Sequence, residues 1–176
     1  MKKVLIIINN GFEECETIVP YDLLKRAGIE VSIASRNEFI TGSHGLTIKR
    51  DLDLTNVSFD IYDLVVLPGG PEFIENQKDK LYLSAITYFK NNKALAAICA
   101  TPTILGKMGL LDGINYTLFT PMNKDFNGYF TNSKVETSSN VITSRSCGTA
   151  YDFAFAIVKY LFDEEKVNKL KQDILY

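Results

Sequence analysis

The sequence predicts one doubly wound α/β domain with a mostly parallel sheet, spanning residues 1–176. Short, strongly apolar runs alternate along the chain with segments of helical periodicity, which is the pattern of a parallel sheet covered by helices. Glycine- or proline-rich turns, or a sharp entry into a helix, follow several of these runs. A chain of this length can also bury a substantial core without disulfides or metal.

The first 35 residues predict a strand–helix–strand unit. Residues 3–9 form a branched apolar run that ends near Asn10-Gly11, as expected for a buried strand. Apolar residues recur at helical spacing over residues 13–27, and Gly28 supplies the stop. Residues 30–35 then form the next strand.

The middle of the chain predicts two more strand–helix pairs. Residues 36–62 are less regular, with short extended pieces around residues 46–48. A buried strand over residues 63–67 ends at Pro68-Gly-Gly-Pro71, and a helix follows at about residues 80–91. The strand over residues 94–98 leads directly into a helix over residues 101–108, where Pro102 occupies a tolerated first-turn position.

The last third predicts strands over residues 116–119 and 141–144. The segment from Thr149 to Asp152 resembles a capping box with aspartate in place of glutamate, opening an amphipathic helix to about residue 162. A charged helix closes the chain.

Composition excludes several classes of function. The chain is 46% hydrophobic with a formal net charge of −2 and no basic stretch, so neither nucleic acid nor a membrane is an expected partner. The longest apolar run, residues 4–8, is too short for a membrane span or a signal peptide, which predicts a cytoplasmic protein. Three cysteines without a Cys-x-x-Cys pair and a single histidine do not make a zinc site. We therefore expect no metal site.

Cys99 is the strongest candidate for chemistry. It stands between a predicted strand and a predicted helix, flanked by small residues, as in a nucleophile elbow. The first N–H groups of the following helix would then favour the thiolate. The alternative is a buried cysteine that acts only as a small hydrophobe.

A cluster of glutamates follows the first strand. Glu13 and Glu14 are interpreted as acidic residues that stabilise the start of a helix. Glu16 would point inward, because it precedes Ile18 in the apolar spacing. A buried carboxyl beside a thiolate would have a raised pKa, so it could stay protonated and donate a hydrogen bond.

The remaining candidates carry weaker signals. Gly69 and Gly70 either form a tight turn or offer backbone N–H groups to an oxyanion. His44 lies in a Gly-Ser-His-Gly loop and is expected to be exposed. Cys15 and Cys147 are expected to pack rather than react, although Cys147 lies in a turn.

Taken together, these turns resemble the ThiJ/PfpI superfamily, in particular the branch of the human parkinsonism-associated deglycase. The resemblance covers nearly the whole chain. It rests on Gly11-Phe-Glu-Glu-Cys-Glu-Thr-Ile-Val-Pro20, Leu24-Lys-Arg-Ala-Gly28, Asp63-Leu-Val-Val-Leu-Pro-Gly-Gly70, Ala96-Ala-Ile-Cys-Ala-Thr-Pro102 and Thr143-Ser-Arg-Ser-Cys-Gly-Thr149.

The resemblance implies a flavodoxin-like fold, of the class I glutamine amidotransferase type, and a homodimer with its site near the subunit interface. It implies that Cys99 is an oxidisable nucleophile with Glu16 as its carboxyl partner. The backbone amides of Gly69, Gly70 and Ala100 would approach the sulfur. Arg26, Arg145 and His44 become candidates for anion contact or dimer packing, although Arg26 is equally well explained as a cation at a helix C-terminus.

Two positions depart from the family pattern. Thr120 stands where relatives often place a histidine near the nucleophile, which argues against peptidase activity because a general base is missing. Cys147 replaces a common proline.

Two functions remain open. One is a cofactor-free, glyoxalase- or deglycase-like activity on small dicarbonyls such as methylglyoxal. The other is a non-enzymatic oxidative-stress sensor or chaperone that acts through a Cys99 sulfinate. Thiamine-precursor metabolism, an older assignment of relatives, has no phosphate-binding loop to support it.

Overall fold

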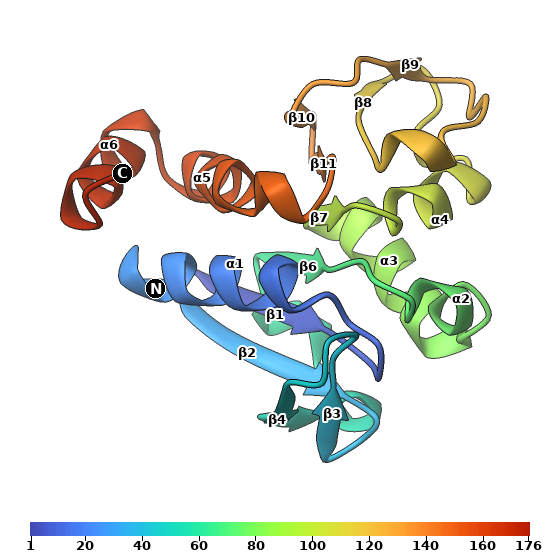
Figure 1. Cartoon of the computed structure of the whole chain (residues 1–176), viewed down its shortest axis with the longest axis horizontal. Helices are drawn as coiled ribbons and strands as arrows, with labels where there is room; N and C mark the ends of the chain where they lie inside the picture. The colour runs from blue at the N-terminus through green and yellow to red at the C-terminus, as the bar shows by residue number, and fades with distance from the viewer.

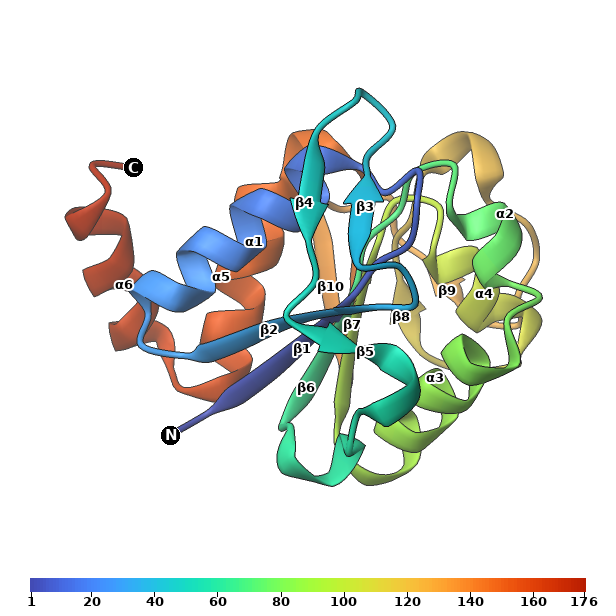
Figure 2. The ribbon, with the colours of Figure 1, turned by 90° about the horizontal axis from the view of Figure 1, so that it is seen from below.

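The computed structural model describes residues 1–176 and contains one mixed, mainly parallel sheet with helices on both faces (Figures 1 and 2). Its strands lie in the spatial order β10 (Val135–Ser138), β11 (Val141–Ser144), β7 (Ala94–Ile98), β6 (Leu64–Leu67), β1 (Lys3–Ile7), β2 (Glu30–Ser35) and β5 (Leu52–Asp53). Only β10 pairs antiparallel, with β11 at the edge of the sheet. The predicted doubly wound α/β fold is confirmed.

Two layers of helices cover the sheet. The helices are α1 (Glu14–Arg26), α2 (Phe73–Asn76), α3 (Lys80–Asn92), α4 (Pro102–Lys107), α5 (Ala150–Leu161) and α6 (Glu164–Asp173). Figure 2 shows α1 and α5 on one side of the sheet and α3 and α4 on the other. None of these helices has the length and apolar content needed to cross a membrane.

The core consists of two clusters separated by the sheet. Along β1, Val4 and Ile6 belong to the cluster beneath α1 and α5, whereas Leu5 and Ile7 belong to the cluster beneath α3 and α4. This alternation follows from the two-residue period of a strand. It explains why the central strands read as continuous apolar runs, since both of their faces are buried.

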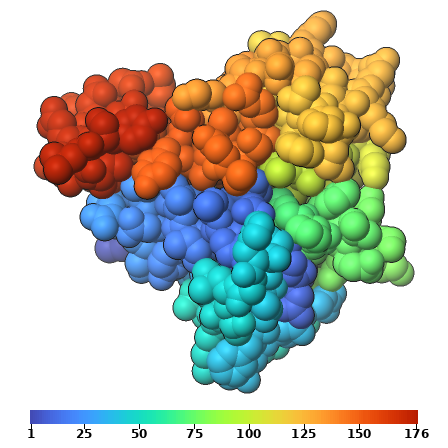
Figure 3. Space-filling view, in the orientation of Figure 1, coloured from blue at the N-terminus to red at the C-terminus, as the bar shows by residue number.

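A small hairpin lies outside the main sheet. It pairs β3 (Phe39–Thr41) with β4 (Thr47–Lys49), and Figure 3 shows it in cyan as a lobe beside the blue N-terminal segment. A second short pair joins β8 (Asn115–Tyr116) to β9 (Tyr129–Phe130). The strand predicted over residues 116–119 is therefore wrong beyond Tyr116.

The capping box predicted at Thr149 is also wrong, because the observed one begins three residues earlier, at Ser146. Thr149 precedes α5 without a side-chain cap. Its hydroxyl instead accepts a hydrogen bond from the Ser146 amide, at the start of the 3-10 turn Cys147–Thr149. The Thr149 and Ser144 hydroxyls also lie 2.7 Å apart. This network fixes the turn that follows β11, beside Cys99.

Candidate active site

The site lies beyond the carboxyl ends of β1, β6 and β7, where open parallel sheets bind their ligands. Cys99 directly follows β7 and has a positive φ of 64°. Such a backbone costs a non-glycine residue about 1–3 kcal/mol and persists only when its surroundings enforce it. The Cys99 N–H donates to the Ser144 carbonyl at 3.0 Å, and its own carbonyl accepts from the Phe119 N–H at 2.9 Å. The predicted elbow is present.

The Pro68–Gly70 turn is bound to this elbow. The Thr101 hydroxyl donates to the Pro68 carbonyl at 2.6 Å. A Cβ added to Gly69 would lie 2.9 Å from the Cys99 Cβ and 2.8 Å from Glu16 Oε2. Only glycine fits there, because real Cβ atoms do not approach so closely.

Glu16 is fully buried, as its spacing predicts. Its Oε2 accepts a hydrogen bond from the Gly69 N–H at 2.8 Å, while its Oε1 is buried without a hydrogen-bond partner. Burial raises the pKa of Glu16 to about 7, partly offset by the Gly69 amide and the Cys99 side chain. The carboxyl is thus poised to hold or release a proton near neutral pH.

Cys99 is half-buried, and its thiol does not have the lowered pKa that the helix start predicts. Burial raises the pKa, as does the negative charge of Glu16, and the Ala100 N–H only partly opposes them. Helix α4 is just six residues long, so its dipole is small against this desolvation. A thiolate forms here most readily when Glu16 holds the proton, because its charge then no longer opposes that of the sulfur.

The three predicted amide donors have different positions. The Gly69 N–H points at Glu16 instead of the sulfur, so this prediction is corrected. The Ala100 N–H lowers the pKa of the Cys99 thiol against the larger effect of burial. The Gly70 N–H makes no hydrogen bond within the protein. Ala100 and Gly70 therefore remain the candidate donors, and their role stays a prediction.

Glu13 and Glu14 do more than stabilise the start of α1. Glu14 Oε1 accepts the His44 backbone N–H at 2.7 Å, and its Oε2 lies 2.9 Å from His44 Nδ1. Against the effect of burial, hydrogen bonds from His44 and Ser43 lower the pKa of Glu14 to about 2. The two glutamates and His44 place possible metal-ligand atoms within 4.8 Å of one another. These contacts attach the β3–β4 hairpin to α1.

The three candidate cationic side chains do not gather around Cys99. His44 is exposed as predicted, with 72% of its side chain accessible, and its Nδ1 faces carboxylates rather than an anion site. Arg26 forms an ion pair with Asp22 at the far end of α1, about 15 Å along the helix from Glu16. Arg145 follows β11, and its guanidinium donates to the Asn132 carbonyl at 3.2 Å. Within one chain, Arg26 does not reach Cys99.

One predicted packing residue and one buried carboxyl differ from the expectations drawn from the sequence. Cys15 is exposed rather than packed, and Cys147 is exposed, in keeping with its place in a turn. Glu72, in the loop before α2, is buried and accepts a hydrogen bond from the Asn9 backbone N–H. Desolvation raises the pKa of Glu72 well above its ordinary value. Nothing in the Gly-Pro-Glu-Phe segment indicates burial, because a glutamate after a turn normally faces water.

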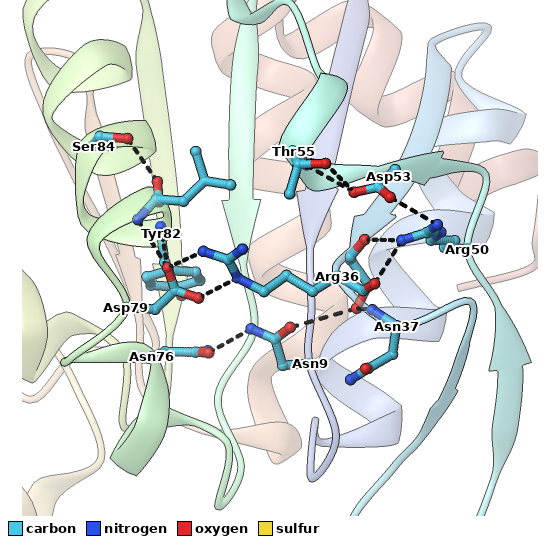
Figure 4. A network of polar contacts seen from close by, with 12 residues as sticks. Asn9, Arg36, Asn37, Arg50, Asp53, Thr55, Asn76, Asp79, Tyr82 and Ser84 are labelled. Atoms are coloured by element: carbon cyan, nitrogen blue, oxygen red, sulfur yellow. Dashed lines mark hydrogen bonds and ion pairs between the residues drawn. The ribbon is translucent and has the colours of Figure 1, made fainter.

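A network of polar side chains around Asn9 and Arg36 holds the ends of β1 and β2 in place (Figure 4). The Asn9 amide donates to Asn76 Oδ1 at 2.7 Å. Arg36 binds both carboxylate oxygens of Asp79, at 2.7 and 2.9 Å. Asp79 also caps the first turn of α3. The network thus joins the ends of β1 and β2 to α2 and α3 behind the site.

The chain is similar to known proteins of one family. The model of the DJ-1/PfpI family matches residues 2–160. Protein dj-1beta of Drosophila melanogaster is 35% identical over 99% of this chain and 97% of its own length. Deglycase PfpI of Pyrococcus furiosus is 36% identical over 90% of this chain and 99% of its own length. The crystal structure of Drosophila melanogaster DJ-1beta has a TM-score of 0.91 at 36% identity, covering 99% of this chain and 97% of the other. The chain belongs to the DJ-1/PfpI family.

Proposed function

We propose that the protein is a cysteine-dependent, cofactor-free enzyme that converts small dicarbonyls such as methylglyoxal, as a glyoxalase or deglycase does. The observation that carries the proposal is Cys99 on its strained elbow beside the buried Glu16 carboxyl. A relative 36% identical to this chain is named a deglycase, which supports the same class of reaction.

The reaction would begin with a proton transfer. Ionised Glu16 accepts the thiol proton, and the Cys99 sulfur attacks the aldehyde carbon, forming a C–S bond. Glu16 then returns the proton to the carbonyl oxygen, which gives a hemithioacetal. The Gly70 and Ala100 amides would stabilise that oxygen while its charge develops.

Glu16 would then carry a proton from the hemithioacetal carbon to the neighbouring ketone carbon, while the hemithioacetal hydroxyl proton moves to the ketone oxygen, which converts the hemithioacetal into the thioester of a hydroxy acid. Water hydrolyses the thioester, the C–S bond breaks, and the hydroxy acid leaves with Cys99 restored. A pKa of about 7 suits this shuttle, because a general acid–base group works best near the ambient pH.

The test is methylglyoxal consumption by purified wild type, Cys99→Ser and Glu16→Gln. Loss of the nucleophile should abolish turnover, and loss of the shuttle should slow it about 100-fold or more. Cys15→Ser is a matched control, because it removes an exposed thiol one residue from Glu16. Equal turnover in wild type and Cys99→Ser would refute the proposal, as would the absence of turnover in the wild type.

The second candidate function is a non-enzymatic stress sensor or chaperone that acts through a Cys99 sulfinate. The half-buried sulfur beside a carboxyl that can stay protonated favours it, since such a carboxyl can donate a hydrogen bond to a sulfinate oxygen. Mild peroxide followed by intact-mass measurement tests it, together with the suppression of client aggregation. Oxygen that does not accumulate on Cys99 would exclude this function.

Peptidase activity has less support. Thr120, at the position of the family histidine, is exposed and donates to Asn132 Oδ1 at 2.8 Å, so it supplies no general base. No observed feature favours thiamine-precursor metabolism.

We also propose a homodimer in the cytoplasm. The outer face of α1 exposes Cys15 and Ile18 next to Glu16, which suits a packed interface near the site. Three free cysteines are typical of a reducing compartment. Light scattering on the purified protein tests the assembly, and a monomer at micromolar concentration would contradict it.

A further inference from the structure

All three cysteines of the chain lie beyond the carboxyl ends of the parallel strands, at the same end of the sheet. Cys99 directly follows β7, Cys147 opens the 3-10 turn after β11, and Cys15 lies in the first turn of α1. Strands β7 and β11 pair in parallel, with Ile98 opposite Ser144. Because Cys99 donates its N–H to Ser144, Cys147 is only three residues from the backbone bonded to Cys99.

Glu16 lies between Cys99 and Cys147 and interacts with both. Its carboxyl lies close enough to the Cys99 side chain and to the Cys147 backbone N–H that both lower its pKa. The turn that carries Cys147 is held by reciprocal hydrogen bonds between Ser146 and Thr149. Cys147 is exposed and Cys99 half-buried, so a small oxidant can reach both thiols.

Cys15 is the less suitable neighbour for Cys99. It precedes Glu16 on α1, and successive helical residues point about 100° apart. Glu16 is buried in the site, whereas Cys15 is turned about 100° from it and is exposed. The charge of Cys147 acts on the pKa of Cys99, and Cys15 is not among the groups that do so, although Cys15 acts on Cys147. Cys147, which replaces the proline common in the family, is the better candidate.

We propose that Cys147 is a resolving cysteine, which captures oxidised Cys99 in an intramolecular disulfide. The inference rests on the reactive Cys99 that the proposed function also needs, but it does not require dicarbonyl turnover. The oxidant is hydrogen peroxide. The Cys99 sulfur attacks one peroxide oxygen, the O–O bond breaks, and the products are a sulfenic acid and water.

The Cys147 sulfur then attacks the sulfenic sulfur. An S–S bond forms, the S–O bond breaks, and the departing hydroxide takes the Cys147 proton to become a second water. Two thiols are oxidised and one peroxide is reduced. The disulfide halts oxidation before the sulfinic acid, which thiols do not reverse, so Cys99 can be recovered by a dithiol.

The experiment treats reduced wild type, Cys147→Ser, Cys147→Ala and Cys15→Ser with equimolar peroxide, then alkylates and maps peptides by mass spectrometry. In wild type and Cys15→Ser we expect a peptide that joins Cys99 to Cys147, reversed by dithiothreitol. Wild-type alkylatable thiols should fall from three to one. Both Cys147 variants should instead gain oxygen on Cys99.

Three results would overturn the proposal: equal sulfinate yields in wild type and both Cys147 variants, a disulfide that includes Cys15, or unmodified Cys99. The wild-type result does not depend on any variant folding. Methylglyoxal turnover is measured separately on the reduced protein. A disulfide without turnover would contradict the proposed enzyme alone, and turnover without the disulfide would contradict the resolving role alone.

Discussion

Replacing Glu16 with glutamine should flatten part of the pH dependence of folding stability. The side chain is fully buried and its pKa is raised to about 7 from an ordinary 4.5. Folding therefore favours the protonated carboxyl. The folded state keeps this advantage below pH 4.5 and loses it as the pH rises through 7. Glutamine has nearly the same shape and carries no titrating group.

The size of the effect follows from the two pKa values. Each pKa unit corresponds to 1.36 kcal/mol, so ionising Glu16 inside the folded protein costs about 3 kcal/mol. Between pH 5 and pH 8, wild type should lose about 2.5 kcal/mol more stability than Glu16→Gln, because the unfolded carboxyl is already largely ionised at pH 5. Glu72, whose pKa is also raised, stays in both proteins, and most of its contribution cancels because the charge of Glu16 is the smallest cause of its shift.

Urea unfolding at pH 5 and pH 8 measures this difference, with Glu165→Gln as a control that removes an exposed carboxyl. The reasoning is refuted if wild type and Glu16→Gln lose the same stability between the two pH values. It is also refuted if Glu165→Gln reproduces the effect, since burial would then not be its cause.

Three further changes probe the same region. Gly69→Ala brings a Cβ to 2.9 Å from that of Cys99. We therefore expect the free energy of unfolding in urea to fall by about 1–3 kcal/mol and the rate of Cys99 alkylation by iodoacetamide to change. Unchanged values would show that the turn can move. Thr101→Val removes the 2.6 Å hydrogen bond to the Pro68 carbonyl and should cost about 1–3 kcal/mol in urea, because that buried oxygen loses a partner. Glu72→Gln should make the melting temperature fall less than in wild type between pH 5 and pH 8, since its raised pKa favours the protonated form; an equal fall would contradict burial as the cause.

Much of the fold could be predicted because the sheet is buried on both faces. The strands over residues 30–35, 94–98 and 141–144 were predicted with their observed bounds. The edge strand β10 was missed, because its half-exposed residues do not form an apolar run. Residues 117–119 read as a strand by their apolar content, but the Phe119 amide binds the Cys99 carbonyl instead of continuing β8.

The sequence predicts which strand ends carry the site, but not how the groups at those ends bind one another. Cys99 and the inward direction of Glu16 follow from junctions and spacing. The partner of the Gly69 amide does not, because it depends on where a carboxyl from another element lies. The raised pKa of the Cys99 thiol likewise depends on burial and on the charge of Glu16, which are tertiary properties.

The left-handed backbone of Cys99 has a consequence for the history of the chain. Glycine adopts such a φ without steric cost, so the fold by itself would be more stable with glycine at position 99. A lineage released from selection on this thiol should therefore drift away from cysteine here sooner than at a position without strain. A cysteine found at position 99 in a descendant would therefore indicate that the thiol is still in use.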